Sequence, residues 1–484
     1  MRRRRASTRP GGVTLVGALA GTLVGAGPTG APAAQEAPPG TPECADRSFA
    51  YVRSEERASA YADRACDRDR FDRLRYLPLG DSLGDAVLSV GGELRGRYEL
   101  YTEEDFGGAP ADGDGTWRGR AYLLLGLERE GLGRAVVSLR AAGQADTDQA
   151  SAAPIDGGGL DLQEGFLEIG EAAGLALRLG RQEISFPLRP PSRLLSARDG
   201  PNVRRSWDAG RLIWNGGGWR TDAFYARAVE IEDGSFDDVS DGDIEFWGVH
   251  AAQAGPGFDL YYYGLADEAP PFQGIGDPAA SERRHTFGLR YTVAPEAAGL
   301  DVDAEAAWQT GSVGDQDVRA GFAAMDAGWT TDTALGWRLG GQLFASTGDD
   351  DPGDDRVGTF NELFPSGAYL NGAALLRGQN ILSAAARIDL SPCAGCQLSG
   401  FYTHYWRTER ADGLYAQSGR LQRAGTPQDG RAIGGYLGLR GRYPIDHRNG
   451  VVFQAGRFFP GAFLEDTGGS DETVFLRIDY EWQL

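Results

Sequence analysis

The stretch that decides the fold is Thr473-Val474-Phe475-Leu476-Arg477-Ile478-Asp479-Tyr480-Glu481-Trp482-Gln483-Leu484. From Val474 onward every second residue is apolar, and most of the residues between them are polar or charged. Successive side chains of a β-strand point to opposite faces, so this pattern predicts a strand with one apolar and one polar face. In a membrane barrel the apolar face contacts lipid and the polar face lines the lumen. We expect this strand to close such a barrel, because the bilayer interior requires every backbone N–H and C=O to be paired.

The same alternation recurs along most of the chain. Between Glu93 and Leu100, charged residues fall on one face, and Leu, Gly and Tyr fall on the other. Segments of about 9 to 15 residues, long enough for a tilted strand to cross the hydrocarbon region, begin near eighteen positions. These are Leu88, Trp117, Arg134, Asp161, Leu175, Arg205, Trp219, Ile244, Phe258, Arg284, Leu300, Asp317, Thr333, Gln379, Gln397, Ile433, Val451 and Thr473. The sequence therefore predicts an all-β fold, a closed antiparallel transmembrane β-barrel of about 18 strands over residues 85–484.

The breaks between these segments alternate in length. Short breaks lie near 130–133, 172–174, 215–218, 255–257, 391–396 and 444–447. Longer polar stretches lie near 102–116, 145–159, 187–203, 230–243, 266–283, 348–377, 408–431 and 460–471. Bacterial outer-membrane barrels have short periplasmic turns and longer external loops. The alternation favours a membrane barrel over a soluble sandwich and predicts the cell outer membrane as its location.

The N-terminal residues have the pattern of an export signal. Five arginines precede an apolar stretch from Gly11 to Gly27, and small residues near Ala34 suit a signal peptidase. We expect residues 1–34 to be a signal peptide. Residues 35–84 are charged, with irregularly spaced aromatics, and predict a short periplasmic extension. Whether this extension or the loop 348–377 blocks the lumen stays open.

Composition and charge exclude several classes of protein. Beyond the signal, the chain has no apolar run long enough for a membrane-spanning helix. The 3.6-residue period of a helix-rich soluble enzyme is also missing from most of it. The net charge is −21 and becomes −26 once the five arginines of the signal are removed. Such an acidic chain is not expected to bind nucleic acid.

Four cysteines in an exported chain predict disulfide bonds. Their spacing suggests Cys44 with Cys66 and Cys393 with Cys396, while two other connectivities remain open. No His follows Cys396, as a c-type haem site would require, and no second Cys-x-x-Cys motif supports a zinc site. We therefore interpret Cys393 and Cys396 as a disulfide that closes a turn. The Asp-rich stretch 349–355 lacks the spacing and terminal Glu of a calcium loop. We expect no metal and no cofactor.

Several stretches resemble the alginate-export family of outer-membrane channels. They are Gly180-Arg181-Gln182-Glu183, Arg198-Asp199-Gly200-Pro201-Asn202-Val203-Arg204-Arg205-Ser206-Trp207-Asp208-Ala209-Gly210-Arg211, Phe360-Asn361-Glu362-Leu363-Phe364-Pro365 and Phe458-Phe459-Pro460-Gly461-Ala462-Phe463-Leu464. The resemblance covers about residues 85–484 and implies an eighteen-stranded barrel whose arginine-lined lumen passes an anionic polysaccharide outward. Two features depart from the family pattern. Ala209 separates Asp208 from Gly210, which puts the local strand register in doubt, and Leu484 replaces a terminal aromatic.

Charged residues of such a barrel should face the lumen, because a basic side chain facing lipid at the midplane costs about 2 to 4 kcal/mol. Residues 178–211 contain eight arginines and three acids. This local excess predicts an anion-selective constriction, since the forked donors of arginine match carboxylates. The alternative is that each arginine is a structural partner of a carboxylate. The candidate substrate-binding residues are Arg95, Arg97, Arg181, Arg193, Arg198, Arg204, Arg205, Asp208 and Arg211.

These features predict a passive channel for an anionic polysaccharide or another anionic solute, and the resemblance implies alginate-like export. A general or nutrient-specific porin is the main alternative. An outer-membrane hydrolase is a weaker one, because His250, His285, His404 and His447 lie in no recognisable catalytic constellation, and we expect no enzyme activity. The expected partners are the anionic solute, outer-membrane lipid and lipopolysaccharide, and periplasmic export proteins.

Overall fold

The computed structural model divides the chain into two units, residues 1–41 and 42–484. It describes residues 47–80, 84–103, 105–108, 115–145, 154–170, 174–188, 192–270, 280–294 and 298–484. The predicted signal peptide and Cys44 lie outside these residues. Within the described ranges, no helix is long and apolar enough to cross a membrane.

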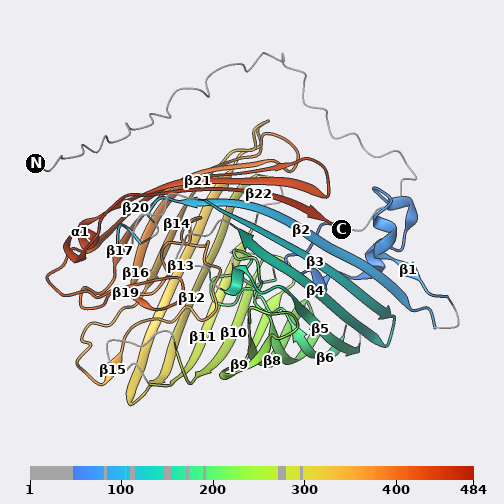
Figure 1. Ribbon diagram of the computed structural model, residues 1–484, viewed down its shortest axis with the longest axis horizontal. Helices are drawn as coiled ribbons and strands as arrows, with labels where there is room; N and C mark the ends of the chain where they lie inside the picture. The colour runs from blue at the N-terminus through green and yellow to red at the C-terminus, as the bar shows by residue number, and fades with distance from the viewer. Residues whose placement is uncertain are drawn as a thin grey trace, which may run out of the picture. The chain divides into compact units, whose positions relative to one another are not determined.

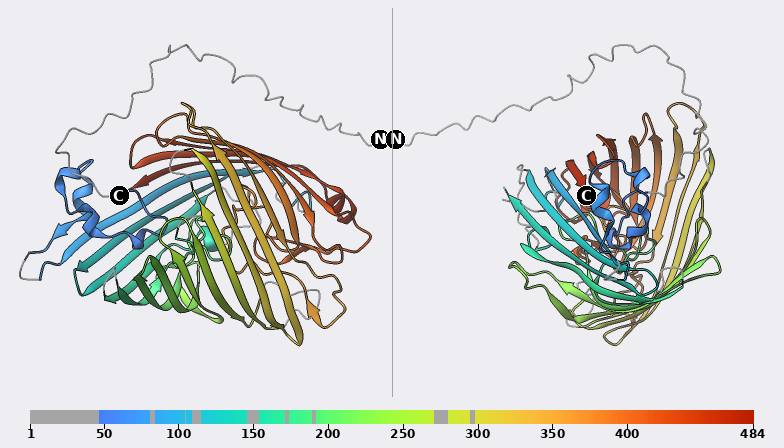
Figure 2. Two further views of the ribbon diagram at one scale, coloured as in Figure 1. Left: turned by 180° about the vertical axis from the view of Figure 1, so that it is seen from behind. Right: turned by 90° about the vertical axis from the view of Figure 1, so that its right-hand side faces the viewer.

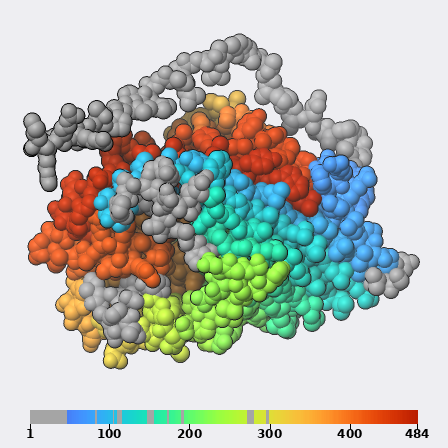
Figure 3. All heavy atoms as spheres, viewed as in Figure 1, coloured from blue at the N-terminus to red at the C-terminus, as the bar shows by residue number. Residues whose placement is uncertain are grey.

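Eighteen long strands form a closed antiparallel barrel (Figure 1). They are β2 (Val87–Tyr101), β3 (Thr116–Arg129), β4 (Gly133–Ala145), β5 (Leu160–Gly170), β6 (Leu175–Gln182), β7 (Trp207–Gly216), β8 (Trp219–Glu230), β9 (Val239–Gln253), β10 (Phe258–Asp267), β11 (Glu282–Val293), β12 (Gly299–Val313), β13 (Gln316–Thr330), β14 (Arg338–Ser346), β16 (Ile381–Leu390), β17 (Gln397–Arg407), β20 (Ala432–Pro444), β21 (Asn449–Pro460) and β22 (Thr473–Gln483). Each pairs with its sequence neighbours, and β22 pairs with β2 to close the sheet, with Arg97 opposite Asp479. Figure 3 shows the last strands, in red, lying against the first, in blue. The predicted fold class and strand number are confirmed.

Most strands begin within a few residues of the predicted positions, because side-chain alternation marks them directly. The largest shifts are in β9, which begins at Val239 instead of Ile244, and β14, which begins at Arg338 instead of Thr333. Short connections gather at one end of the barrel, the short-turn end, and longer ones at the other, the loop end. At the loop end the β12–β13 connection is also short, consisting of Gly314 and Asp315.

Alternate side chains of each strand face opposite sides of the barrel wall. On β3, Leu123, Leu125 and Leu127 are exposed on the outer surface, whereas Leu124 is buried inside. On β2, Leu94 is exposed while Arg95 beside it is buried. Apolar side chains therefore cover the outer face, and charged ones fill the lumen, as a barrel in lipid requires.

Two segments of the loop end fold into the barrel. Residues 183–206 connect β6 to β7, and residues 347–380 connect β14 to β16. Leu195 of the first segment bridges to Phe364 of the second, and the Ser196 amide donates to the Phe364 carbonyl at 2.9 Å. The Phe364 ring packs against Trp207 and Phe246 of the wall, with ring centroids 4.7 and 5.0 Å apart. An apolar core therefore lies inside the barrel.

Residues 47–78 lie at the short-turn end, within the ring of strands (Figure 2, right). They form the short helices η1 (Arg53–Glu55), η2 (Ala58–Tyr61), η3 (Arg64–Cys66) and η4 (Asp72–Arg75), and strand β1 (Leu77–Pro78), which pairs with β2. Arg448 of the β20–β21 turn holds this segment through Asp69 and Asp72, each at 2.6 Å. Part of the N-terminal extension thus occupies the mouth of the barrel.

The connections between the barrel strands contain smaller elements. They are β15 (Arg356–Val357), β18 (Leu414–Tyr415), β19 (Leu421–Arg423) and helix α1 (Ala462–Thr467). Cys393 and Cys396 form a disulfide in the β16–β17 turn at the short-turn end, as their spacing predicted. Cys66 is also disulfide-bonded, and its predicted partner Cys44 lies outside the described residues.

Candidate functional site

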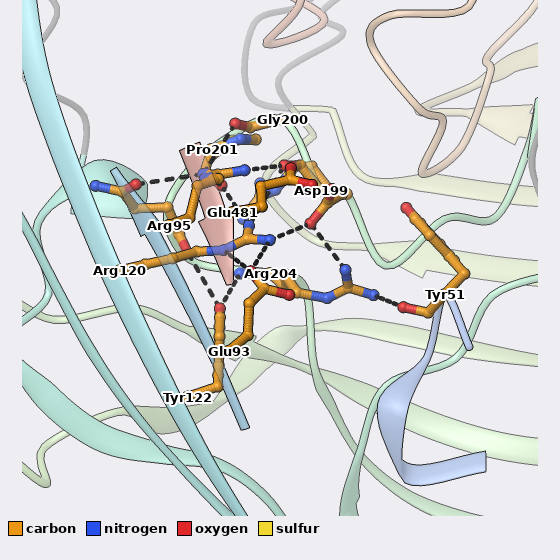
Figure 4. A network of polar contacts seen from close by, with 12 residues as sticks. Tyr51, Glu93, Arg95, Arg120, Tyr122, Asp199, Gly200, Pro201, Arg204 and Glu481 are labelled. Atoms are coloured by element: carbon orange, nitrogen blue, oxygen red, sulfur yellow. Dashed lines mark hydrogen bonds and ion pairs between the residues drawn. The ribbon is translucent and has the colours of Figure 1, made fainter. Parts of the chain in front are cut away.

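A network of ion pairs surrounds Asp199 in the inward-folded β6–β7 segment (Figure 4). Its Oδ1 lies 2.6 Å from Nη2 of Arg120 on β3 and 2.8 Å from Nη1 of Arg204 in the same segment. Arg204 also pairs with Glu183 at 2.8 Å. Burial raises the pKa of Asp199, but Arg120, Arg204 and Arg95 lower it well below the usual range of a carboxyl. The charge of Arg204 is therefore balanced within the protein.

Arg95 and Arg97 are buried on the inner face of β2, where they hold the same segment. Arg95 donates to the carbonyls of Asp199 and Pro201, both at 2.8 Å. Arg97 bonds to the Asp479 carboxylate and to the Gly200 carbonyl. These two arginines position the loop and offer few free donors to a solute.

Two further predicted arginines pair with acids that are distant in the sequence. Arg193 contacts three carboxylates of β12 and β13, namely Asp303 at 3.0 Å, Glu305 at 2.8 Å and Asp326 at 2.8 Å. Arg211 on β7 contacts Asp222 of β8 at 2.8 Å and Glu55 of η1 at 3.4 Å. The expectation that unpaired charge survives across the whole stretch 178–211 is therefore wrong for these positions, because long-range partners were invisible in the local sequence.

Arg181 and Asp208 lie on the outer face of the barrel, so the prediction that they line the lumen is wrong. They face each other across β6 and β7 and form a two-pronged ion pair, with distances of 2.9 and 3.1 Å. Arg181 alternates with the exposed Leu177 and Leu179, whereas Arg178 faces the lumen. The pair lies at the loop end of β6, where a charge near the interface costs little. Asp208 and Arg211 are separated by Ala209 and Gly210, so they fall on opposite faces of β7, with Asp208 outside and Arg211 in the lumen.

Among the described residues, no carboxylate lies within ion-pair distance of Arg198, Arg205 or Arg95, and of these three only the Arg95 guanidinium donates to backbone carbonyls. Arg198 and Arg205 are half-buried in the β6–β7 segment, and Arg205 stacks over Phe364 at 4.9 Å. Arg198 Nε and Arg205 Nη1 are buried without a hydrogen-bond partner in the described structure. Burial lowers the pKa of Arg205 well below its usual range, and the nearby Arg198 and Arg377 lower it further. The two arginines thus carry uncompensated positive charge.

Arg377 and Glu362 complete this cluster from the inward-folded β14–β16 segment. Arg377 Nε lies 3.8 Å from Glu362 Oε2 and has no hydrogen-bond partner in the part of the chain described here. Burial raises the pKa of Glu362 to about 7, although Arg377 opposes this. Neither residue is among the candidates that the sequence predicted. Glu362 lies in the Phe360–Pro365 stretch that carries the family resemblance, and this could have identified it as a candidate. No feature of the sequence distinguishes Arg377 from the other arginines.

A cavity of about 570 Å³ lies in the lumen on the opposite wall. Its basic side chains are Arg338, Arg387 and Arg440, and Tyr369 of the β14–β16 segment contributes to its lining. Acidic lining residues are Asp301, Asp303, Asp326 and Asp389. Arg338 pairs with Asp301 at 2.5 Å and with Asp389 at 3.3 Å. This cavity is polar and of mixed charge, and its lining residues lie outside the predicted constriction of residues 178–211.

Two acidic groups in the described structure have the spacing of metal ligands, but both already have protein partners. Asp69 and Asp72 near His447 bind Arg448, and Asp161 accepts backbone amides of residues 237 and 238. His250 is stacked between Phe186 and Tyr261, and its Nδ1 lies 2.8 Å from the Tyr263 hydroxyl. These groups are accounted for as structural contacts.

Comparison with known proteins points to one family and one architecture. A sequence model described as alginate export matches residues 86–475. No curated protein matches the chain's sequence. The Pseudomonas aeruginosa outer-membrane protein OpdK is 12% identical, with a TM-score of 0.55 over 83% of this chain and 99% of OpdK. Pseudomonas aeruginosa OccK2 (OpdF), solved in complex with glucuronate, is 12% identical, with a TM-score of 0.53 over 83% of this chain and 98% of OccK2.

Proposed function

The chain belongs to the alginate-export family, and from that premise we propose that this outer-membrane channel passes an anionic polysaccharide, or a smaller anionic solute, through its lumen. Family and fold are those of transport channels. Alginate itself is the proposed cargo because of the family, and its negative charge is the property that the lumen must recognise.

The observation that carries the proposal is the cluster of Arg198, Arg205 and Arg377. Three guanidinium groups converge from the two inward-folded segments, and Glu362 is the acid beside them, 3.8 Å from Arg377. Guanidinium donors match a carboxylate, and lumen charges are screened less by salt than surface charges. Arg198 also has φ of +55°, a left-handed conformation uncommon for a residue with a side chain. Uncompensated charge and backbone strain at one place support a binding role.

A nutrient-specific porin is the second candidate. The cavity of about 570 Å³ has the size of a small-molecule site, and the inward-folded segments narrow the path around it. The structure of OccK2 contains glucuronate, whose carboxylate is chemically equivalent to that on each unit of a polyuronate. A small uronate is thus the natural alternative cargo.

Block of single-channel current tests both candidates. Oligouronates of increasing length should block wild-type current at decreasing concentrations if a polymer is the cargo, because successive carboxylates bind together. Length-independent block would favour the small-solute porin. The Arg198→Gln/Arg205→Gln double variant should raise the blocking concentration, whereas Arg356→Gln, in an exposed pair with Asp350, serves as the control. An unchanged blocking concentration in the double variant would contradict the proposed site.

We also propose that residues 1–34 direct export and are removed. The arginine-led apolar stretch and the outer-membrane barrel that follows it support this assignment. Mass spectrometry of the purified protein should find an N-terminus near Gln35, and an intact Met1 would overturn it.

A further inference from the structure

The N-terminal segment inserts one short helix, η1, against the inner wall of the barrel at the short-turn end. Ser54 Oγ donates to Glu164 on β5 at 2.8 Å, and Arg134 on β4 donates to the Ser54 carbonyl at 2.5 Å. Arg57 pairs with Glu168 on β5 at 2.6 Å. These contacts place Glu55, at the end of η1, deep in the mouth of the lumen.

Glu55 lies among three arginines on three adjacent strands. Its Oε1 is 2.8 Å from Arg178 on β6 and 3.4 Å from Arg211 on β7, and its Oε2 is 3.2 Å from Arg220 on β8. Burial alone would raise the pKa of Glu55, but Arg178, Arg220 and Arg211 together lower it well below its usual range. Glu55 is therefore held as a carboxylate.

The barrel wall alone does not balance this arginine group. Arg178 also pairs with Glu168, and Arg211 and Arg220 share Asp222. Glu168 is itself shared with Arg134 and Arg57. Within the described residues, these acids are too few for the arginines they serve, so the wall requires a carboxylate from elsewhere. Glu55 supplies it from the N-terminal segment.

Space for a larger anion exists at the same place. A cavity of about 180 Å³ is lined by Glu55, Arg178 and Arg220, together with Arg57, Glu168 and Asn215. The segment that carries Glu55 is also attached independently, through Asp69 and Asp72 to Arg448. Glu55 could therefore leave the arginines while the rest of the segment stays bound.

We propose that Arg178, Arg211 and Arg220 form a carboxylate-binding subsite at the short-turn mouth, which Glu55 occupies until a uronate carboxylate of the solute replaces it. The inference rests on the proposed function, since it identifies where the anionic solute first binds. The exchange replaces one carboxylate by another on the same guanidinium donors, so no buried arginine is left unpaired during entry. The N-terminal segment acts as an internal competitor for the site.

The test uses the full-length protein and sodium glucuronate as the probe. Glu55→Gln should lower the half-blocking glucuronate concentration by about tenfold, because an occupied site weakens apparent affinity by the fraction that is free. Glu56→Gln is the matched control, since Glu56 bonds to Arg53 and Arg75 of its own segment, and it should change the value less than twofold. Adding Arg220→Gln to Glu55→Gln should reverse the gain.

Two results would overturn the subsite. One is an unchanged half-blocking concentration in Glu55→Gln, and the other is a gain that survives Arg220→Gln, which would mean that the variant merely opens the mouth. Calorimetric titration of the same variants separates this inference from the proposed function. Tighter glucuronate binding by Glu55→Gln in a cation-selective pore would leave the subsite standing and refute the channel's anion preference. An anion-selective pore with unchanged binding would do the opposite.

Discussion

Protonation of Glu362 should increase the anion selectivity of the pore as pH falls through about 7. Burial raises the pKa of this carboxyl to about 7, so Glu362 is ionised at pH 8.5 and protonated at pH 5.5. Its carboxylate lies 3.8 Å from Arg377 Nε, beside Arg198 and Arg205. Losing its negative charge therefore raises the net positive charge of the cluster by one.

The size of the effect follows from Coulomb's law. Two unit charges about 4 Å apart interact by roughly 1 kcal/mol in water and about 4 kcal/mol at an effective dielectric constant of 20. Once Glu362 is protonated, a solute anion that passes the cluster is no longer repelled by it. In a well-hydrated pore this repulsion amounts to the lower value, roughly 1 kcal/mol. Since about 1.4 kcal/mol corresponds to tenfold, the anion permeability should rise about fivefold between pH 8.5 and 5.5, and the anion-to-cation permeability ratio should rise by at least that factor.

Reversal potentials of single channels across a salt gradient, measured at several pH values, provide the assay. Glu362→Gln keeps an acceptor for the Gly378 amide, which donates to Glu362 at 2.7 Å, and should fix the pore in its low-pH selectivity. Asp349, whose pKa burial raises to about 6, also titrates in this range, so the variant is the essential control. An equal pH dependence in wild type and Glu362→Gln would refute the reasoning.

Three further predictions concern the barrel wall and the turn. Asp479→Asn should destabilise the barrel by about 3 to 5 kcal/mol, since it leaves the buried Arg97 and the half-buried Arg477 without the carboxylate that they share; an unchanged midpoint of urea unfolding would contradict this. Asp208→Asn should leave the reversal potential unchanged because the residue faces outward, and a clear shift would return it to the lumen. Replacing Cys393 and Cys396 by Ser should lower the free energy of unfolding by about 2 kcal/mol at most, because the closed loop is short. A larger loss in the same urea titration would show that the disulfide contributes more to stability than its loop length predicts.

The strands were predictable because a barrel in lipid imposes a period of two on every strand. The terminal stretch from Thr473 and the start of β2 already contain the alternation that the closed sheet confirms. Loop positions followed from the same reasoning, since polar stretches that cannot cross the bilayer must connect the strands. One boundary failed because the strand extends into a polar stretch, as β9 does before Ile244.

The site was less predictable because charge balance in a barrel is made across the lumen. Arg193 finds its partners on β12 and β13, more than a hundred residues away, and Arg211 finds Glu55 in the N-terminal segment. Because these acids lie outside residues 178–211, the sequence of that stretch alone cannot reveal either pairing. The inserted Ala209 put the strand register in doubt, but β6 and β7 pair there without a shift, with Arg181 opposite Asp208.

We propose that this acidic chain encloses an anion-selective pore, and the reversal potential of the wild-type protein across a potassium chloride gradient decides whether it does. The sequence has a net charge of −21, so a pore governed by overall charge would prefer potassium. The uncompensated cluster of Arg198, Arg205 and Arg377 predicts preference for chloride, reduced in Arg198→Gln/Arg205→Gln. Preference for potassium in wild type, or an identical potential in the double variant, would show that these arginines do not set the selectivity of the pore.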